Sequence, residues 1–171
     1  TEKSCAAARY ENIDKQPLHF KFPTDFTGKL SDMPKTKIKA AVIREKGSNS
    51  EREMADAMHL AGFDVRDVHM TDLIEGRETL EDINFIVAVG GFSNSDVLGS
   101  AKGWAGAFKY NEKAKNALDH FFARPDTLSL GVCNGCQLFV ELGLITPGHL
   151  EKPKMIPNDS GKFECTFTSV T

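Results

Sequence analysis

The sequence predicts an α/β fold in which a parallel β-sheet is covered by helices on both faces. Short apolar runs alternate with amphipathic segments from Lys37 onward. The runs at 38–43 and 84–89 are mostly apolar at consecutive positions, which is typical of strands that are buried on both sides. Alternation of strand and helix along a chain favours a parallel sheet, because each helix carries the chain back to the start of the next strand.

Four strands are expected, each centred on an apolar run. The first strand is predicted at 38–43 (IKAAVI), the second at 63–70 (FDVRDVHM), the third at 84–89 (NFIVAV) and the fourth at 127–132 (TLSLGV). In parallel sheets, ligands collect at the carboxyl ends of the strands. The loops "GGFSNSD" and "GVCNGCQ" follow the third and fourth strands, so we expect the functional site there.

Helices are predicted between these strands, because apolar residues recur there at helical spacing. Ser50 and Glu53 form an S-x-x-E pattern that predicts a capping box, and apolar residues then recur at helical spacing as far as Ala61. Further helices are predicted at 111–122 (NEKAKNALDHFF) and 136–143 (CQLFVELG).

The composition excludes several classes of protein. The chain has 171 residues and a net charge of −3, so no basic surface favours nucleic acid as a partner. No apolar run approaches the length of a membrane span, and no secretory signal pattern opens the chain. Four cysteines in a chain of this length do not suggest a disulfide scaffold, so a reducing cytoplasmic location is expected.

The chain is expected to contain a leader and one domain. Residues 1–36 have mixed character and are predicted to be a linker from a preceding region, whereas residues 37–171 form the domain. The chain opens on Thr1 and closes inside the strand-like alternation "KFECTFTSVT", so we expect a fragment of a longer polypeptide.

The loop "GVCNGC" has the G-x-C-x-G pattern of a nucleophile elbow, with cysteine in place of serine. Cys133 would stand on a tight strand-to-helix turn, for which Gly131 and Gly135 leave space. The amides at the start of the next helix would stabilise its thiolate. The N–H of Asn134 could donate to an oxyanion.

A second glycine-rich loop could complete an oxyanion hole. Gly90 and Gly91 allow the backbone to approach a ligand closely, and an N–H from this loop would face that of Asn134. A nucleophile with two donors is the minimum for acyl transfer through a thioester.

Other interpretations of the cysteines remain open. Cys133 and Cys136 form a C-x-x-C pair that could be redox-active in a flavodoxin-like module without acyl-transfer activity. A zinc site would need a second close pair, which Cys5 and Cys165 do not form, so no metal is expected. Under the elbow interpretation, Cys136 is expected to be packed. Another type of cysteine-elbow enzyme is a third possibility.

Four stretches carry a resemblance to a known family. They are "AVIREKGSNSEREMADAMHLAGFDVRDVHMTDL", "GGFSNSDVLGSAKGWA", "ALDHFFARPDTLSLGVCNGCQLFVELG" and "NDSGKFE", and together they span most of residues 37–170. The chain resembles the glutaminase domain of the large, single-chain phosphoribosylformylglycinamidine synthases, which are class I glutamine amidotransferases. The resemblance implies a flavodoxin-like parallel sheet whose C-terminal part is missing from this fragment.

The resemblance also implies an activity. Cys133 would attack the side-chain amide of glutamine, form a glutamyl thioester and release ammonia. Asn134, with Gly90 or Gly91, would form the oxyanion hole. Gln137 would contact glutamine, together with Phe92 and Ser93.

The partner implied by the resemblance is a synthetase domain of the same polypeptide. It would use ATP and Mg to convert formylglycinamide ribonucleotide into the formylglycinamidine ribonucleotide of de novo purine biosynthesis. No cofactor is expected in the glutaminase domain itself, and neither a membrane nor a nucleic acid is expected as a partner.

The sequence departs from the family pattern at several positions. The family commonly reads "GGFSYGD" and "SGRFE", whereas Asn94, Ser95 and Lys162 stand here in place of Tyr, Gly and Arg. The family places its catalytic His and Glu well downstream of the nucleophile, so they would lie beyond residue 171. The fragment alone is therefore expected to be inactive in turnover. Of the histidines in this chain, His69 at the end of the second strand is the best placed to act as a substitute base, but it is not expected to do so.

Overall fold

The computed structural model describes residues 2–11 and 38–165. The chain separates into two compact units, one of residues 30–155 and the other of residues 1–29 together with 156–171. In the smaller unit, helix α1 spans Glu2–Glu11, and residues 156–165 form no helix or strand. Part of the strand-like stretch 162–171 lies outside the described residues, and its described part, 162–165, is not a strand.

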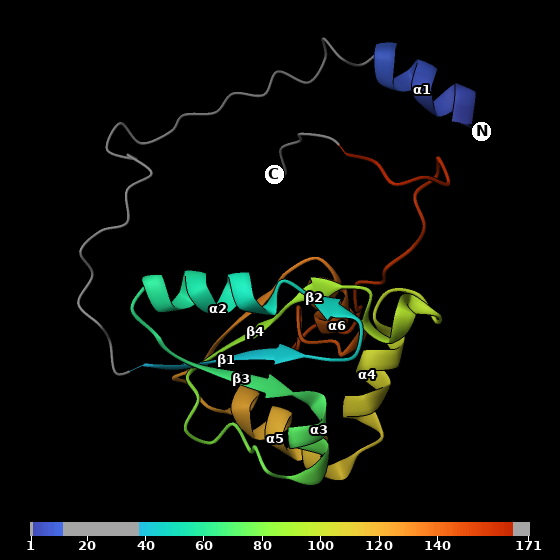
Figure 1. The fold of residues 1–171 in the computed structure, drawn as a ribbon. Helices are drawn as coiled ribbons and strands as arrows, with labels where there is room; N and C mark the ends of the chain where they lie inside the picture. The colour runs from blue at the N-terminus through green and yellow to red at the C-terminus, as the bar shows by residue number, and fades with distance from the viewer. Residues whose placement is uncertain (1, 12–37, 166–171) are drawn as a thin grey trace. The chain divides into compact units, whose positions relative to one another are not determined.

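The larger unit is built on a parallel four-stranded sheet, as predicted (Figure 1). Its strands are β1 (Lys39–Arg44), β3 (Asp64–His69), β4 (Phe85–Ala88) and β6 (Leu128–Gly131). Their order, β3-β1-β4-β6, is that of flavodoxin-like sheets. Every pair of neighbours is parallel, so all four carboxyl ends meet at one edge of the sheet.

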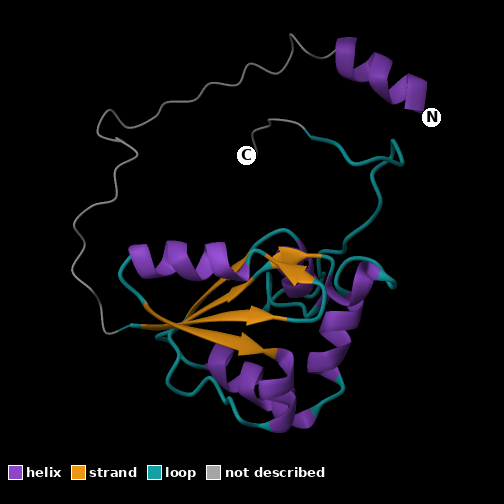
Figure 2. Cartoon of the chain, viewed as in Figure 1, coloured by secondary structure: helices purple, strands orange, loops and turns teal. Residues whose placement is uncertain are grey.

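Five helices accompany the strands of the sheet: α2 (Glu51–Leu60), α3 (Met70–Glu75), α4 (Lys102–Lys109), α5 (Glu112–Ala123) and α6 (Asn134–Glu141). Helix α2 lies over one face of the sheet, and α3 and α5 lie over the other (Figures 1 and 2). The α/β fold with helices on both faces is therefore confirmed.

Burial differs sharply between the central and the edge strands. The central strands β1 and β4 bury most of their residues, as their apolar runs predict. The edge strand β6 has Leu128 74% exposed and Leu130 43% exposed. The core is completed by large buried side chains from the helices, among them Trp104, Phe108 and Phe121.

A second, very short sheet lies at the carboxyl edge and was not predicted. Strand β2 (Ser48–Asn49) pairs antiparallel with β5 (Gly90–Gly91). A Cβ atom on Gly91 would lie 2.5 Å from the backbone nitrogen of Asn49, so only glycine permits this approach. The pairing holds the glycine-rich loop against the turn that follows β1. The loop continues into a 3-10 helix, η2 (Ser93–Asp96).

The capping box predicted for α2 is wrong. Ser50 has a left-handed backbone, with φ of 70° and ψ of 20°, and its side chain makes no capping hydrogen bond. An N-cap side chain reaches the helix amides from an extended backbone, and the turn out of β2 imposes a different one. Helix α5, by contrast, is capped by Asn111, whose side chain accepts a hydrogen bond from the N–H of Ala114.

Candidate active site

Cys133 stands on a strained turn between β6 and α6. Its φ is 54° and its ψ is −110°, a backbone conformation that residues other than glycine rarely adopt. Its side chain is exposed. This is the geometry that the G-x-C-x-G pattern predicts, with the cysteine at the start of a helix and at the carboxyl end of a strand.

The two glycines of the pattern allow α6 to begin directly against the sheet. A Cβ atom on Gly135 would lie 2.0 Å from the carbonyl oxygen of Ala88 in β4. A Cβ atom on Gly131 would lie 2.7 Å from the carbonyl oxygen of Gly135. Both distances are far below normal contact, so glycine at these positions is a steric requirement of the turn.

The glycine-rich loop lies against the cysteine. A Cβ atom on Gly90 would be 3.1 Å from the Cβ and 3.7 Å from the Sγ of Cys133. Among the described residues, no group accepts a hydrogen bond from the backbone N–H of Asn134. The fold thus brings Gly90, Cys133 and Asn134 together, as the hypothesis of an oxyanion hole between two loops requires. Gly91 instead packs against strand β2 of the second sheet.

A buried hydrogen-bond chain joins the two loops beneath the cysteine. The Ser93 hydroxyl donates to the Asn134 Oδ1 at 2.6 Å, and the Asn134 Nδ2 donates to the Gln137 Oε1 at 2.9 Å. Ser93 is 1% exposed and Asn134 is 2% exposed. Sequence reasoning selected all three residues but gave no sign of these contacts, because partners 41 residues apart meet only in the folded sheet.

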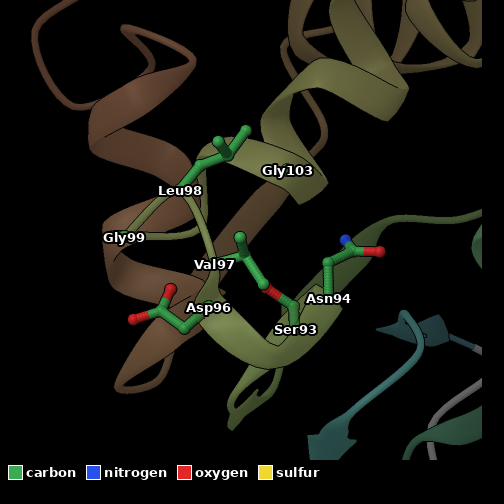
Figure 3. Close-up of a pocket in the computed structure, with 7 residues that line it drawn as sticks. All are labelled: Ser93, Asn94, Asp96, Val97, Leu98, Gly99 and Gly103. Carbon is green, nitrogen blue, oxygen red and sulfur yellow. The ribbon is translucent and has the colours of Figure 1, made fainter.

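The loop after β5 departs from ordinary backbone geometry. Positive φ occurs at five non-glycine residues within it, namely Asn94, Ser95, Asp96, Ser100 and Ala101. A cavity of about 210 Å³ lies inside this loop, and Figure 3 shows the residues that line it. They include Ser93, Asn94 and Asp96 but not Cys133. Phe92, expected to contact substrate, is 72% exposed at the start of the loop.

His69, the histidine considered as a substitute base, does not lie against the Cys133 thiol. His69 ends β3, and its ring accepts a hydrogen bond from the N–H of Thr71 at the start of α3. Strands β1 and β4 separate β3 from β6. Three strand spacings put His69 roughly 14 Å from the end of β6. His69 is therefore too distant to act as a base for Cys133.

Cys136 is exposed, so the expectation that it is packed is wrong. Its backbone lies against Gly131, and β6 is an edge strand, which leaves this part of the first turn of α6 open. Cys133 and Cys136 are both free thiols. Within residues 2–11 and 38–165, no three potential ligands among His, Cys, Asp and Glu are grouped to hold a metal ion.

Several ion pairs involve residues of β1, β3 and α3. Hydrogen bonds from Lys39 and Arg66 lower the pKa of Asp82 to about 2. A hydrogen bond from Arg77 lowers the pKa of Asp72. These side chains lie on β1, on β3, on α3 and in the segment between α3 and β4, so they take no part in the elbow.

Comparisons with known proteins agree with this geometry. Residues 37–171 match the family described as CobB/CobQ-like glutamine amidotransferase domain, and the chain belongs to that family. It is 44% identical over 186 aligned residues to the "Probable phosphoribosylformylglycinamidine synthase, chloroplastic/mitochondrial" of Arabidopsis thaliana. That alignment covers 99% of this chain and 13% of the plant protein, so the chain spans a small part of its relative.

A solved structure shares the fold. "Structure of PurLQS from Thermotoga maritima" superimposes with a TM-score of 0.59 at 30% identity, covering 77% of this chain and 53% of that one. None of the described helices is long and apolar enough to cross a membrane.

Proposed function

We propose that this chain is part of a glutaminase that supplies ammonia by hydrolysing the side-chain amide of glutamine, and that it contributes Cys133 as the nucleophile. The observation that carries the proposal is the elbow itself: Cys133 has a strained backbone at the start of a helix, and its side chain faces Gly90. Membership of a glutamine amidotransferase family supports the same substrate.

In the proposed reaction, the Cys133 sulfur bonds to the amide carbon of glutamine, and the carbonyl oxygen becomes an oxyanion. The backbone N–H of Asn134 and one from the Gly90–Gly91 loop stabilise that charge. The proton of the Cys133 thiol is transferred to the amide nitrogen, the C–N bond breaks, ammonia leaves, and a glutamyl thioester remains. Water hydrolyses the thioester to glutamate and returns the thiol.

The wider reaction is proposed from the plant relative. Ammonia would pass to a synthetase region that uses ATP and Mg to convert formylglycinamide ribonucleotide into formylglycinamidine ribonucleotide in purine biosynthesis. The glutaminase unit itself would need no cofactor. Its cysteine content favours a reducing compartment, and the cytosol is the proposed one.

The first experiment is labelling with 6-diazo-5-oxo-norleucine, an electrophile that resembles glutamine, followed by peptide mass analysis. We expect an adduct on Cys133 that excess glutamine prevents. Cys133→Ser should abolish the adduct, and the matched Cys136→Ser variant should keep it.

A different outcome would favour a redox module. The specific observation behind this second candidate is that both thiols are exposed on the first turn of α6. If mild oxidation produces a Cys133–Cys136 disulfide and the electrophile gives no glutamine-sensitive adduct, the glutaminase proposal is overturned.

A further inference from the structure

We infer that Ser93 is a positioning residue that sets, through Asn134, which end of the Gln137 amide faces the ligand. The inference rests on the proposed function, and it concerns how the same site recognises glutamine. Ser93 was expected to touch the substrate itself, whereas its hydroxyl points to the Asn134 side chain beneath the elbow.

The hydrogen-bond chain has a direction, because each amide has one accepting end and one donating end. Ser93 donates to the Oδ1 of Asn134, so the Nδ2 of Asn134 faces Gln137. That nitrogen donates to the Oε1 of Gln137. The donating end of Gln137, its Nε2, is thereby left for a ligand, and no described residue accepts from it.

Burial of Ser93 explains why this direction is preferred. Ser93 is 1% exposed, and among the described residues its hydroxyl donates to Asn134 Oδ1. If the Asn134 amide turned over, its Nδ2 would face Ser93, and the serine proton would be buried without a partner. An unsatisfied buried donor is costly, so the serine hydroxyl holds the amide in one orientation.

The consequence is a preference for an acceptor on the ligand. Gln137 lies one turn after Cys133, and its backbone N–H donates to the Cys133 carbonyl oxygen at 3.2 Å. A fixed Nε2 donor at this place suits an oxygen of a bound amino acid and offers nothing to its ammonium group. Ser93 therefore acts on glutamine binding, and the sulfur chemistry proceeds without it.

The test measures the rate of Cys133 alkylation against the concentration of 6-diazo-5-oxo-norleucine. Ser93→Ala should raise the half-saturating concentration by about tenfold, since a buried hydrogen bond is lost and the Gln137 amide is released. The maximal rate should change by less than about threefold, because the elbow keeps its own steric support. The matched control is Ser95→Ala, on the exposed part of the same loop, which should leave both values unchanged.

A second variant keeps the test decisive if Ser93→Ala does not fold. Asn134→Asp has the same shape but only accepting oxygens, so Gln137 must turn its Nε2 inward to donate to it. The half-saturating concentration should again rise about tenfold. In the unmodified, labelled protein, the side-chain amide protons of Asn134 should exchange slowly with solvent, and fast exchange would overturn the inference.

The outcomes separate this inference from the proposed function. If the unmodified chain gives no glutamine-sensitive adduct, both are overturned. If it does, and Ser93→Ala reacts with an unchanged half-saturating concentration, only the positioning role is overturned. A fall in the maximal rate alone would show a general structural role and would also overturn it.

Discussion

Replacing Gly135 by alanine should separate helix propensity from tertiary packing. Gly135 lies in the first turn of α6, and alanine is a better helix former than glycine by about 1 kcal/mol. Helix propensity alone therefore predicts that the substitution stabilises the protein. The structure predicts destabilisation, because the new Cβ would lie 2.0 Å from the carbonyl oxygen of Ala88.

The size of the effect follows from the movement required. Restoring a contact of 3.0 Å needs a shift of about 1 Å in α6. Neither the Cβ of residue 135 nor the carbonyl oxygen of Ala88 can move easily, since both are fixed to the backbone of a regular element. Overpacking of this kind costs up to about 3 kcal/mol. The shift also strains the 3.0 Å hydrogen bond from Val132 to Ala88, worth about 1 kcal/mol. After the propensity gain, the net loss is about 3 kcal/mol.

The assay is thermal or urea unfolding, with Gly106→Ala as the matched control. Gly106 lies within α4, and a Cβ atom there would be 3.8 Å from the Tyr110 ring, which is ordinary contact. Gly106→Ala should stabilise by about 1 kcal/mol. Gly135→Ala should lower the melting temperature by roughly 10 °C. It should also slow Cys133 alkylation by about 100-fold through displacement of the elbow.

The reasoning is refuted if the two alanine variants behave alike. Equal stability, with unchanged alkylation of Cys133, would mean that α6 can move off β4 at no cost. The steric account of the G-x-C-x-G pattern would then fail at Gly135.

Three further outcomes are expected. Ser95→Gly should raise the free energy of unfolding by about 1 kcal/mol in urea titration, because φ at Ser95 is 56°; a destabilised variant would contradict this. Asn111→Ala should lower it by about 1 kcal/mol through loss of the α5 cap, and an unchanged urea midpoint would refute the cap. Lys39 and Arg66 lower the pKa of Asp82 to about 2, so the carboxylate stabilises the fold above its unfolded pKa of about 4. The stability difference between the protein and Asp82→Asn should therefore be constant from pH 7 to about 4 and vanish as the pH falls to about 2, and high salt should reduce it.

The outcome for particular residues shows where sequence reasoning was sufficient. Within the runs predicted at 38–43 and 84–89, residues 40–43 and 85–89 are apolar at consecutive positions, and both runs became central buried strands, because such a run has no polar face to turn toward water. The glycine spacing around Cys133 predicted a turn that the backbone angles now show. The S-x-x-E pattern at Ser50 failed, since the preceding two-residue strand imposes a left-handed backbone that no local pattern reveals.

The sequence by itself determined the α/β class, the elbow at Cys133 and the second loop at Gly90, because these depend on local periodicity and on glycines at fixed spacing. Only the tertiary structure decided the strand order, which puts His69 three strands away and Gly90 against the sulfur. It also decided that Ser93 binds Asn134. These facts depend on which distant segments become neighbours in the sheet, and that choice is made by the packing of the whole core.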